Sequence, residues 1–342
     1  MDLVISFIGR CEDVQLDLMG PLYVSIGSID RLQAPLLKHF ATRLDYETEE
    51  FVEPLLSMLS TSPHLIDLSW SNQNIAKYPI HKAELLLPWS RLTRVRVDYA
   101  LDVEECLIVL HLCPSLIECT FPLIAFHLPP PLPVHQSMSI VHQHLRVLSL
   151  GSLHEQTYDL LDYLTLPVLS TFALGRLRDD HHRMAFNWPR DSFKAFLSRS
   201  GTVKTFRVQT AILSSLLLVE LLHLLPTLTE LSIEGDEFDP LEDTLFHTLT
   251  YGEKAEMVLC PKLQVITLGG DVLSSEGTLV KMLESRSCSN PSQSRIAVLQ
   301  KAVIVLTGEW DASWEDILEE LEAMRVKGFD VVVERVIHED LV

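Results

Sequence analysis

The residues Pro63-His64-Leu65-Ile66-Asp67-Leu68-Ser69-Trp70 form a pattern in which a proline is followed by apolar side chains at the third, sixth and eighth positions. The same pattern returns at residues 114–121, 167–174, 226–233 and 261–268. Apolar residues alternate with other residues over the last three positions of the pattern, and such alternation is typical of a half-buried strand. Its recurrence predicts a protein that is built from one repeated unit.

Five further copies lack the proline and bring the number of units to ten. The first apolar residues of the ten copies are, in chain order, Cys11, Leu37, Leu65, Leu92, Leu116, Leu145, Leu169, Val203, Leu228 and Leu263. The nine intervals between Cys11 and Leu263 average 28 residues. One strand and one helix fit within a repeat of that length.

The segments between the copies are amphipathic. Apolar side chains recur near the helical period of 3.6 residues in Glu49–Ser60, Leu101–Cys113, Asp191–Ser200 and Leu213–Leu225. A unit of one strand and one helix cannot bury its apolar face alone, whereas stacked units can. The sequence therefore predicts an α/β protein, an open leucine-rich repeat solenoid (horseshoe) with parallel strands on the concave face and helices on the convex face.

Three regions are expected along the chain. Residues 1–284 form the solenoid of about ten units, and the polar residues 285–298 form a linker. Residues 299–342 form a strand–helix–strand cap that continues the solenoid, with its helix at Ser313–Val326 and a C-cap at Gly328. Solenoids need a polar cap at each end, and none is visible before the first unit. We therefore expect an N-terminally uncapped chain that begins inside a larger architecture, or one whose start codon is placed too far downstream.

Composition narrows the classes of partner. The 342 residues include 47 Asp and Glu against 27 Lys and Arg, a net charge of −20. A field of that sign repels nucleic acid and anionic lipid, so neither is expected as a partner. The longest apolar stretch, Ile212–Leu225, is too short to span a bilayer and contains Glu220 and His223. Six Cys without a C-x-x-C pair indicate a reduced intracellular protein, cytoplasmic or nuclear.

Signatures of chemistry are missing from the sequence. No common hydrolase, metalloprotease, P-loop or dinucleotide motif occurs, so we expect no enzyme activity, no cofactor and no metal. The densest ligand-type cluster, Asp179–His182, is interpreted as a solvated loop rather than a metal site. A zinc site at Cys106, Cys113 and Cys119 is the alternative to buried thiols. The acidic residues 315–322 form either a docking face or a solvated helix face.

Several features resemble the leucine-rich regions of fungal F-box proteins, especially those of basidiomycetes. They are the pairs Cys113-Pro114 and Cys260-Pro261, the segment Phe196–Ser200, the pair Leu249-Thr250, and the closing strand–helix–Gly–strand. The resemblance implies that the repeats capture a protein substrate for a cullin ubiquitin ligase. An F-box docks the Skp-type adaptor in that family, but no F-box motif occurs here, so adaptor binding is expected only if an F-box lies upstream.

Other functions stay open beside this one. The main alternative is a free-standing leucine-rich repeat scaffold or inhibitor that is unrelated to ubiquitin. A second alternative is an enzyme, a hydrolase with a non-standard site. A third is a decayed gene copy without any present function.

The partner is expected on the concave face of the strands. Side chains at the positions between the repeat leucines point to this face. The side chains at its centre, from Val147 to Gly175, are small and weakly polar. We expect this centre to hold a partner whose carboxylates pair with the flanking arginines. The alternative is a solvated sheet without a partner. The predicted partner-binding residues are Arg94, Arg96, Glu118, Ser149, Thr171, Thr205, Arg207 and Glu230.

Overall fold

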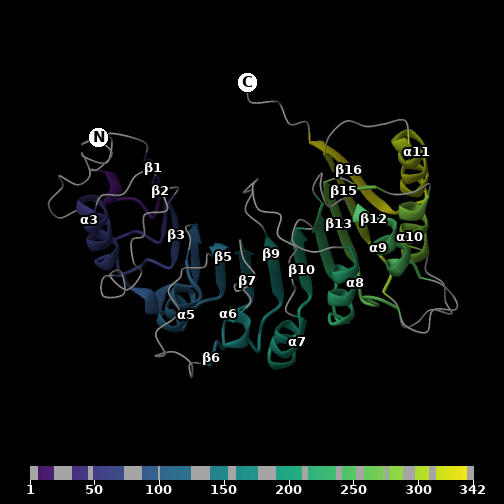
Figure 1. Ribbon diagram of the computed structural model, residues 1–342. Helices are drawn as coiled ribbons and strands as arrows, with labels where there is room; N and C mark the ends of the chain where they lie inside the picture. The colour runs from purple at the N-terminus through teal and green to yellow at the C-terminus, as the bar shows by residue number, and fades with distance from the viewer. Residues whose placement is uncertain are drawn as a thin grey trace. The chain divides into compact units, whose positions relative to one another are not determined.

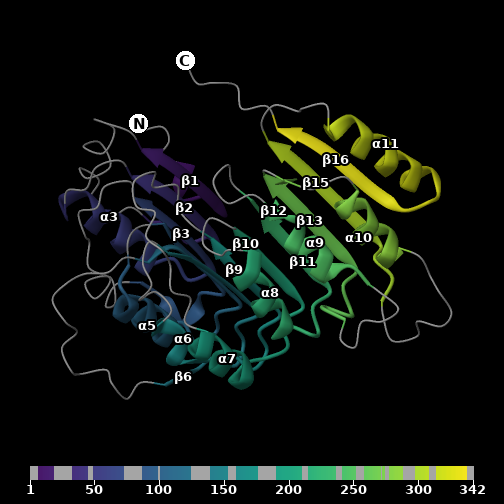
Figure 2. The same cartoon turned by 45° about the vertical axis from the view of Figure 1, so that its right-hand side comes forward.

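The repeated strands pair side by side in the computed structural model, which is drawn in Figures 1 and 2. The structure describes residues 7–18, 33–44, 49–72, 87–98, 101–124, 139–152, 159–175, 190–209, 215–235, 241–251, 258–270, 272–273, 277–287, 297–307 and 313–336. Two predicted features lie wholly or mostly outside these ranges: the cluster Asp179–His182 and the expected linker at residues 285–298.

Each predicted copy of the pattern is a strand of one parallel sheet. The order of its twelve strands is β1-β2-β3-β4-β5-β7-β9-β10-β11-β13-β15-β16. The first ten are the ten predicted copies, and the last two are the apolar runs near the C-terminus. Helices alternate with these strands along the chain. The fold is a leucine-rich repeat solenoid, as predicted.

The described residues fall into two compact units. Unit 1 contains the chain up to Leu169 and residues 190–201. Its strands are β1 (Asp13–Leu18), β2 (His39–Leu44), β3 (Asp67–Asn72), β4 (Arg94–Asp98), β5 (Glu118–Ile124), β6 (Ile140–Val141), β7 (Val147–Ser152) and β8 (Leu164–Thr165). Its helices are α3 (Glu49–Ser60), the 3₁₀ turn η1 (Trp89–Arg91), α5 (Val103–Leu112), α6 (Asp159–Asp162) and α7 (Arg190–Arg199).

Unit 2 contains residues 170–175 and the chain from Thr202 onward. Its strands are β9 (Thr171–Gly175), β10 (Thr205–Gln209), β11 (Glu230–Glu234), β12 (Leu241–Glu242), β13 (Val265–Gly270), β14 (Val272–Leu273), β15 (Lys301–Thr307) and β16 (Asp330–Val336). Its helices are α8 (Ser215–His223), α9 (Asp243–Leu249), α10 (Thr278–Ser287) and α11 (Ser313–Val326). Successive helices contact one another, and α11 packs on β16 (Figure 2).

The core consists of the repeated apolar side chains, which stack from strand to strand. Leu65 and Leu68 are fully buried, and Trp70 at the third position of the same repeat is nearly so. Neighbouring repeats place aromatic rings in contact, as in the stacked pair Phe172–Phe206, whose centroids lie 6.2 Å apart. Full burial of one such side chain contributes about 1.5–3 kcal/mol, so the ladder as a whole carries the stability of the solenoid.

Local sequence signals set the helix boundaries. Helix α5 begins at a capping box in which Glu105 N donates to Asp102 Oδ1 (2.8 Å) and Asp102 N donates to Glu105 Oε2 (3.0 Å). It ends before Cys113-Pro114, where proline disfavours further helix. The expected helix at Leu101–Cys113 therefore starts two residues later, because Asp102 caps it.

Backbone hydrogen bonds at the N-terminal ends of the strands fix the register between repeats. The carbonyl of Ile66 accepts from Thr93 N (2.8 Å) and from Arg94 N (3.1 Å). The carbonyl of Thr93 accepts in the same way from Ile117 N and Glu118 N (2.8 and 3.1 Å). Equivalent residues therefore form straight rows across the strands of each unit.

Gly151 and Gly269 occupy outward positions of β7 and β13, yet both are buried. At Gly151 the reason is a bulge in β5, where the register shifts between Phe121 and Ile124. Pro122 within that bulge has no N–H to donate, and its carbonyl oxygen would lie 1.7 Å from a Cβ at Gly151. Only glycine tolerates this approach. Among the described residues, no helix has the length and apolar character needed to cross a bilayer.

Candidate functional site

The open face of unit 1 carries a row in which acidic and basic side chains alternate. Five register partners on successive strands form this row, and each is the first residue of its strand: Asp13, His39, Asp67, Arg94 and Glu118. Their side chains are exposed or half-buried, as the repeat pattern predicts for this position. Cross-strand neighbours of opposite charge stabilise each other, so the row is a connected polar surface.

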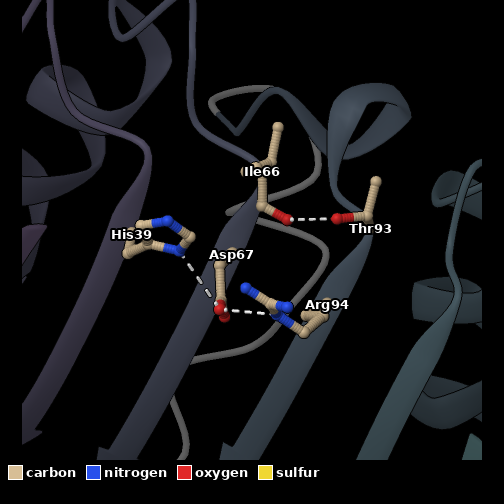
Figure 3. A network of polar contacts seen from close by, with 5 residues as sticks. All are labelled: His39, Ile66, Asp67, Thr93 and Arg94. Carbon is tan, nitrogen blue, oxygen red and sulfur yellow. Dashed lines mark hydrogen bonds and ion pairs between the residues drawn. The ribbon is translucent and has the colours of Figure 1, made fainter. Parts of the chain in front are cut away.

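Asp67 links its two neighbours within this row, as Figure 3 shows. Arg94 Nε donates to Asp67 Oδ2 at 2.8 Å, and His39 Nδ1 lies 3.3 Å from the same oxygen. Because a carboxylate accepts only, His39 carries its proton on Nδ1 in this contact. One carboxylate therefore orients two side chains, one from each neighbouring strand.

Arg96 is held by a bond along its own strand. Its Nε donates to Asp98 Oδ2 at 2.7 Å, from one outward position of β4 to the next. The other oxygen, Asp98 Oδ1, is buried without a hydrogen-bond partner. The Arg94 and Arg96 side chains stay 47% and 53% exposed while their orientation is fixed. The face thus presents two oriented guanidinium groups on one strand.

The remaining predicted site residues of unit 1 lie beside these arginines. Glu118 on β5 is the register partner of Arg94. Ser149 on β7 lies in the same row as Arg96, with Thr120 between them. The structure therefore brings together Arg94, Arg96 and Glu118, and places Ser149 two strands from Arg96.

The predicted site residues of unit 2 form a row of their own. Thr171, Thr205 and Glu230 are register partners on β9, β10 and β11, and Thr205 Oγ1 donates to Glu230 Oε2 (3.2 Å). Arg207, exposed on β10, lies one outward position further along. A second bond runs parallel to the first, from Gln209 Nε2 to an oxygen of the Glu234 carboxylate at 2.9 Å.

Asp67, Asp98 and His39 lie at positions between the repeat apolar residues, but the predicted site does not include them. The signal that identifies them is the register, since Asp67 and His39 share the repeat position of Arg94. The weakly polar trough expected from Val147 to Gly175 involves strands of both units and stays a prediction.

The buried cysteines are core residues. Cys106 and Cys119 are fully buried and free, and burial raises the pKa of each thiol well above its usual value. Burial also raises the pKa of Cys113 and Cys260 to about 12. Protonated thiols of this kind act as small apolar groups. Within the described ranges, no group of three or more His, Cys, Asp or Glu is arranged to hold a metal.

Each Cys-Pro pair has a basic partner from the next repeat. His142 Nε2 donates to the carbonyl of Cys113 (2.7 Å), and Arg286 Nη1 donates to the carbonyl of Cys260 (3.2 Å). Both side chains are buried. Burial lowers the pKa of His142, while its bond to Cys113 raises it, and the balance is a value below the usual 6.5. These contacts lock one repeat to the next.

Comparison with known proteins identifies no family. No protein-family model matches the chain, and no curated protein matches it. Solved structures do match. One of them is a protein from Bacteroides fragilis determined by a structural genomics consortium, with 13% sequence identity and a TM-score of 0.45 over 80% of this chain and 72% of the other. The fold assignment rests on the strands and their register, and this similarity adds nothing about function.

Proposed function

We propose that this protein recognises a protein partner through the open face of its sheet and carries out no chemistry itself. The main support is that Arg94 and Arg96 are oriented through Nε by Asp67 and Asp98 while about half of each side chain stays exposed. An arginine that is already oriented loses less conformational entropy when it binds a carboxylate. An acidic group on a partner is therefore the ligand that suits this part of the face best.

Charge reversal on the face tests this proposal. In affinity capture from the native cell extract, Arg94→Glu/Arg96→Glu is expected to lose the partner that the wild-type chain recovers. The matched control is Arg325→Glu/Lys327→Glu, which makes the same change of charge on exposed residues at the end of α11. Circular dichroism of both variants checks folding. Equal recovery of the partner by wild type and the face variant would refute recognition by these arginines.

A finer proposal follows from the resemblance to fungal F-box proteins. We infer that the chain is the substrate-binding region of an F-box-type subunit of a cullin ubiquitin ligase. The Cys-Pro repeats and the closing strand–helix–Gly–strand support it. Affinity capture with the chain as given, and with a form extended to the next upstream start codon, tests it. Recovery of Skp-type adaptor and cullin by the extended form alone supports the ligase, whereas recovery by neither form favours the free-standing scaffold or inhibitor.

A further inference from the structure

The N-terminal ends of the strands in unit 1 form a second surface, separate from the open face. The residue just before each strand belongs to one row, which runs Glu12, Lys38, Ile66, Thr93, Ile117 and Arg146. Two residues earlier in each repeat lies a second row, which runs Arg10, Leu36, His64, Arg91, Ser115 and His144, and Val168 continues it. Neither row contributes to the face that carries Arg94 and Arg96.

Backbone hydrogen bonds hold the first row in a line. Lys38 N donates to Glu12 O (2.7 Å), Ile66 N to Lys38 O (3.0 Å) and Thr93 N to Ile66 O (2.8 Å). Ile117 and Arg146 continue the same chain of bonds at 2.8 Å each. At one of these steps Thr93 Oγ1 also donates to Ile66 O at 3.1 Å, the side-chain bond that Figure 3 shows. With about 4.8 Å between strands, the five steps span about 24 Å.

Cations and aliphatic side chains share this edge. The cations of the two rows are Arg10, Lys38, Arg91 and Arg146. The only acid of the two rows is Glu12, which accepts from Lys38 Nζ at 2.8 Å. The exposed aliphatic side chains are Leu36, Ile66, Ile117 and Val168, between 36% and 47% exposed. A cationic edge on a chain of net charge −20, with aliphatic groups left in water, is the composition of an interaction surface.

The two rows together, with Val168, are called the edge strip. A depression opens at the end of the edge strip. It has a volume of about 460 Å³ and is lined by Ser115, Ile117, Gln143, His144, Arg146 and Val168. Aliphatic side chains from two different repeats meet there beside a guanidinium and an imidazole. An aliphatic group thus finds an apolar wall in the depression, and a carboxylate finds a cation next to it.

We propose that this edge strip docks an acidic segment of a partner protein that carries aliphatic side chains. Arginines at three places along the strip bind carboxylates, and the depression between Ile117 and Val168 takes an aliphatic anchor. Nucleic acid fits less well, because the two rows contain no Phe, Tyr or Trp for base stacking. An anionic membrane is a poorer match because its extended surface would also meet the acidic parts of the chain, whereas a short acidic segment can contact the cationic rows alone. The inference does not depend on the proposed role of the open face.

Selection of a random peptide library against the full-length chain tests the proposal. We expect the selected peptides to be rich in Asp and Glu with at least one Leu, Ile or Val, and to bind more weakly as salt rises. By fluorescence anisotropy, Arg91→Glu/Arg146→Glu is expected to weaken binding of a selected peptide by at least about tenfold, which is about 1.4 kcal/mol. A second variant, Ile117→Ser/Val168→Ser, tests the depression without changing charge and is expected to act in the same direction.

The matched control is Arg325→Glu/Lys327→Glu, which makes the same change of charge on exposed residues at the end of α11. It is expected to bind the selected peptides as wild type does. Three results would overturn the proposal: selected peptides without acidic residues, equal binding by wild type and both edge variants, or competition for the strip by phosphatidylserine vesicles or single-stranded RNA but not by acidic peptide.

Discussion

Replacing Arg286 with methionine is expected to destabilise unit 2 more than any surface change. Arg286 lies on α10 and is 2% exposed. Its guanidinium donates to three backbone carbonyls: Nε to Leu249 O (2.5 Å), Nη2 to Leu259 O (2.6 Å) and Nη1 to Cys260 O (3.2 Å). Leu249 is the last residue of α9, where carbonyls lack helical partners and attract a positive charge.

The magnitude follows from the three carbonyls. Methionine fills a similar volume but donates nothing, so all three oxygens stay buried without a partner. An unsatisfied buried acceptor costs about 1–3 kcal/mol, which places the loss at about 3 kcal/mol even at the lower end. Removal of one member of a buried charged contact gives a similar range, about 3–5 kcal/mol. We therefore expect the free energy of unfolding to fall by about 3 kcal/mol.

Urea denaturation followed by far-UV circular dichroism measures this loss. Arg286→Met should lower the midpoint without changing the slope. Arg207→Met is the control, since Arg207 is exposed on β10 of the same unit, and its change should stay within about 0.5 kcal/mol. Arg286→Lys keeps the charge but not the planar fork, so it should restore only part of the stability. If Arg286→Met also stays within about 0.5 kcal/mol of wild type, the reasoning is refuted.

Three further predictions concern buried groups. Because the pKa of His142 is lower in the folded chain than its usual 6.5, the unfolded chain takes up a proton first as pH falls. The free energy of unfolding should therefore decrease below pH 6.5. In urea titrations, His142→Gln should flatten that pH dependence. Gly151→Ala would place a Cβ 1.7 Å from Pro122 O and should cost about 1–3 kcal/mol in the same assay, whereas an unchanged midpoint would argue against the bulge. The Cys106 thiol is buried and has a raised pKa, so it should not react with a thiol reagent at neutral pH until urea unfolds the chain. The partly exposed Cys11 should be labelled rapidly. Equally rapid labelling of Cys106 in the folded chain would contradict its burial.

The repeat pattern predicted the strands and the direction of their side chains. Leu65, Leu68 and Trp70 are buried while Asp67 and Ser69 between them are half-buried, because strand side chains alternate between two faces. Helix α11 was predicted at Ser313–Val326, where it is found, since a long amphipathic segment that ends before Gly328 has one favourable conformation. Strand alternation and helical periodicity are local signals, since each depends only on residues that are close together in the sequence.

The partners of each polar side chain were decided by the tertiary structure. Loops of unequal length separate the repeats, so the sequence does not say that one oxygen of Asp67 contacts both His39 and Arg94, or that Arg286 reaches the carbonyl of Cys260. Register between strands determines both, and it is set by the stacking of whole repeats. The bulge at Pro122 likewise buries Gly151 through a contact between two repeats.

By itself, then, the sequence determined the class of fold, the residues of the core and the set of side chains on the open face. Only the tertiary structure decided which of those side chains act together, and that cations and aliphatic groups line one edge of unit 1. The physical reason is the range of the interactions. Alternating burial is satisfied within one strand, whereas ion pairs, carbonyl caps and surface rows depend on which repeats lie side by side.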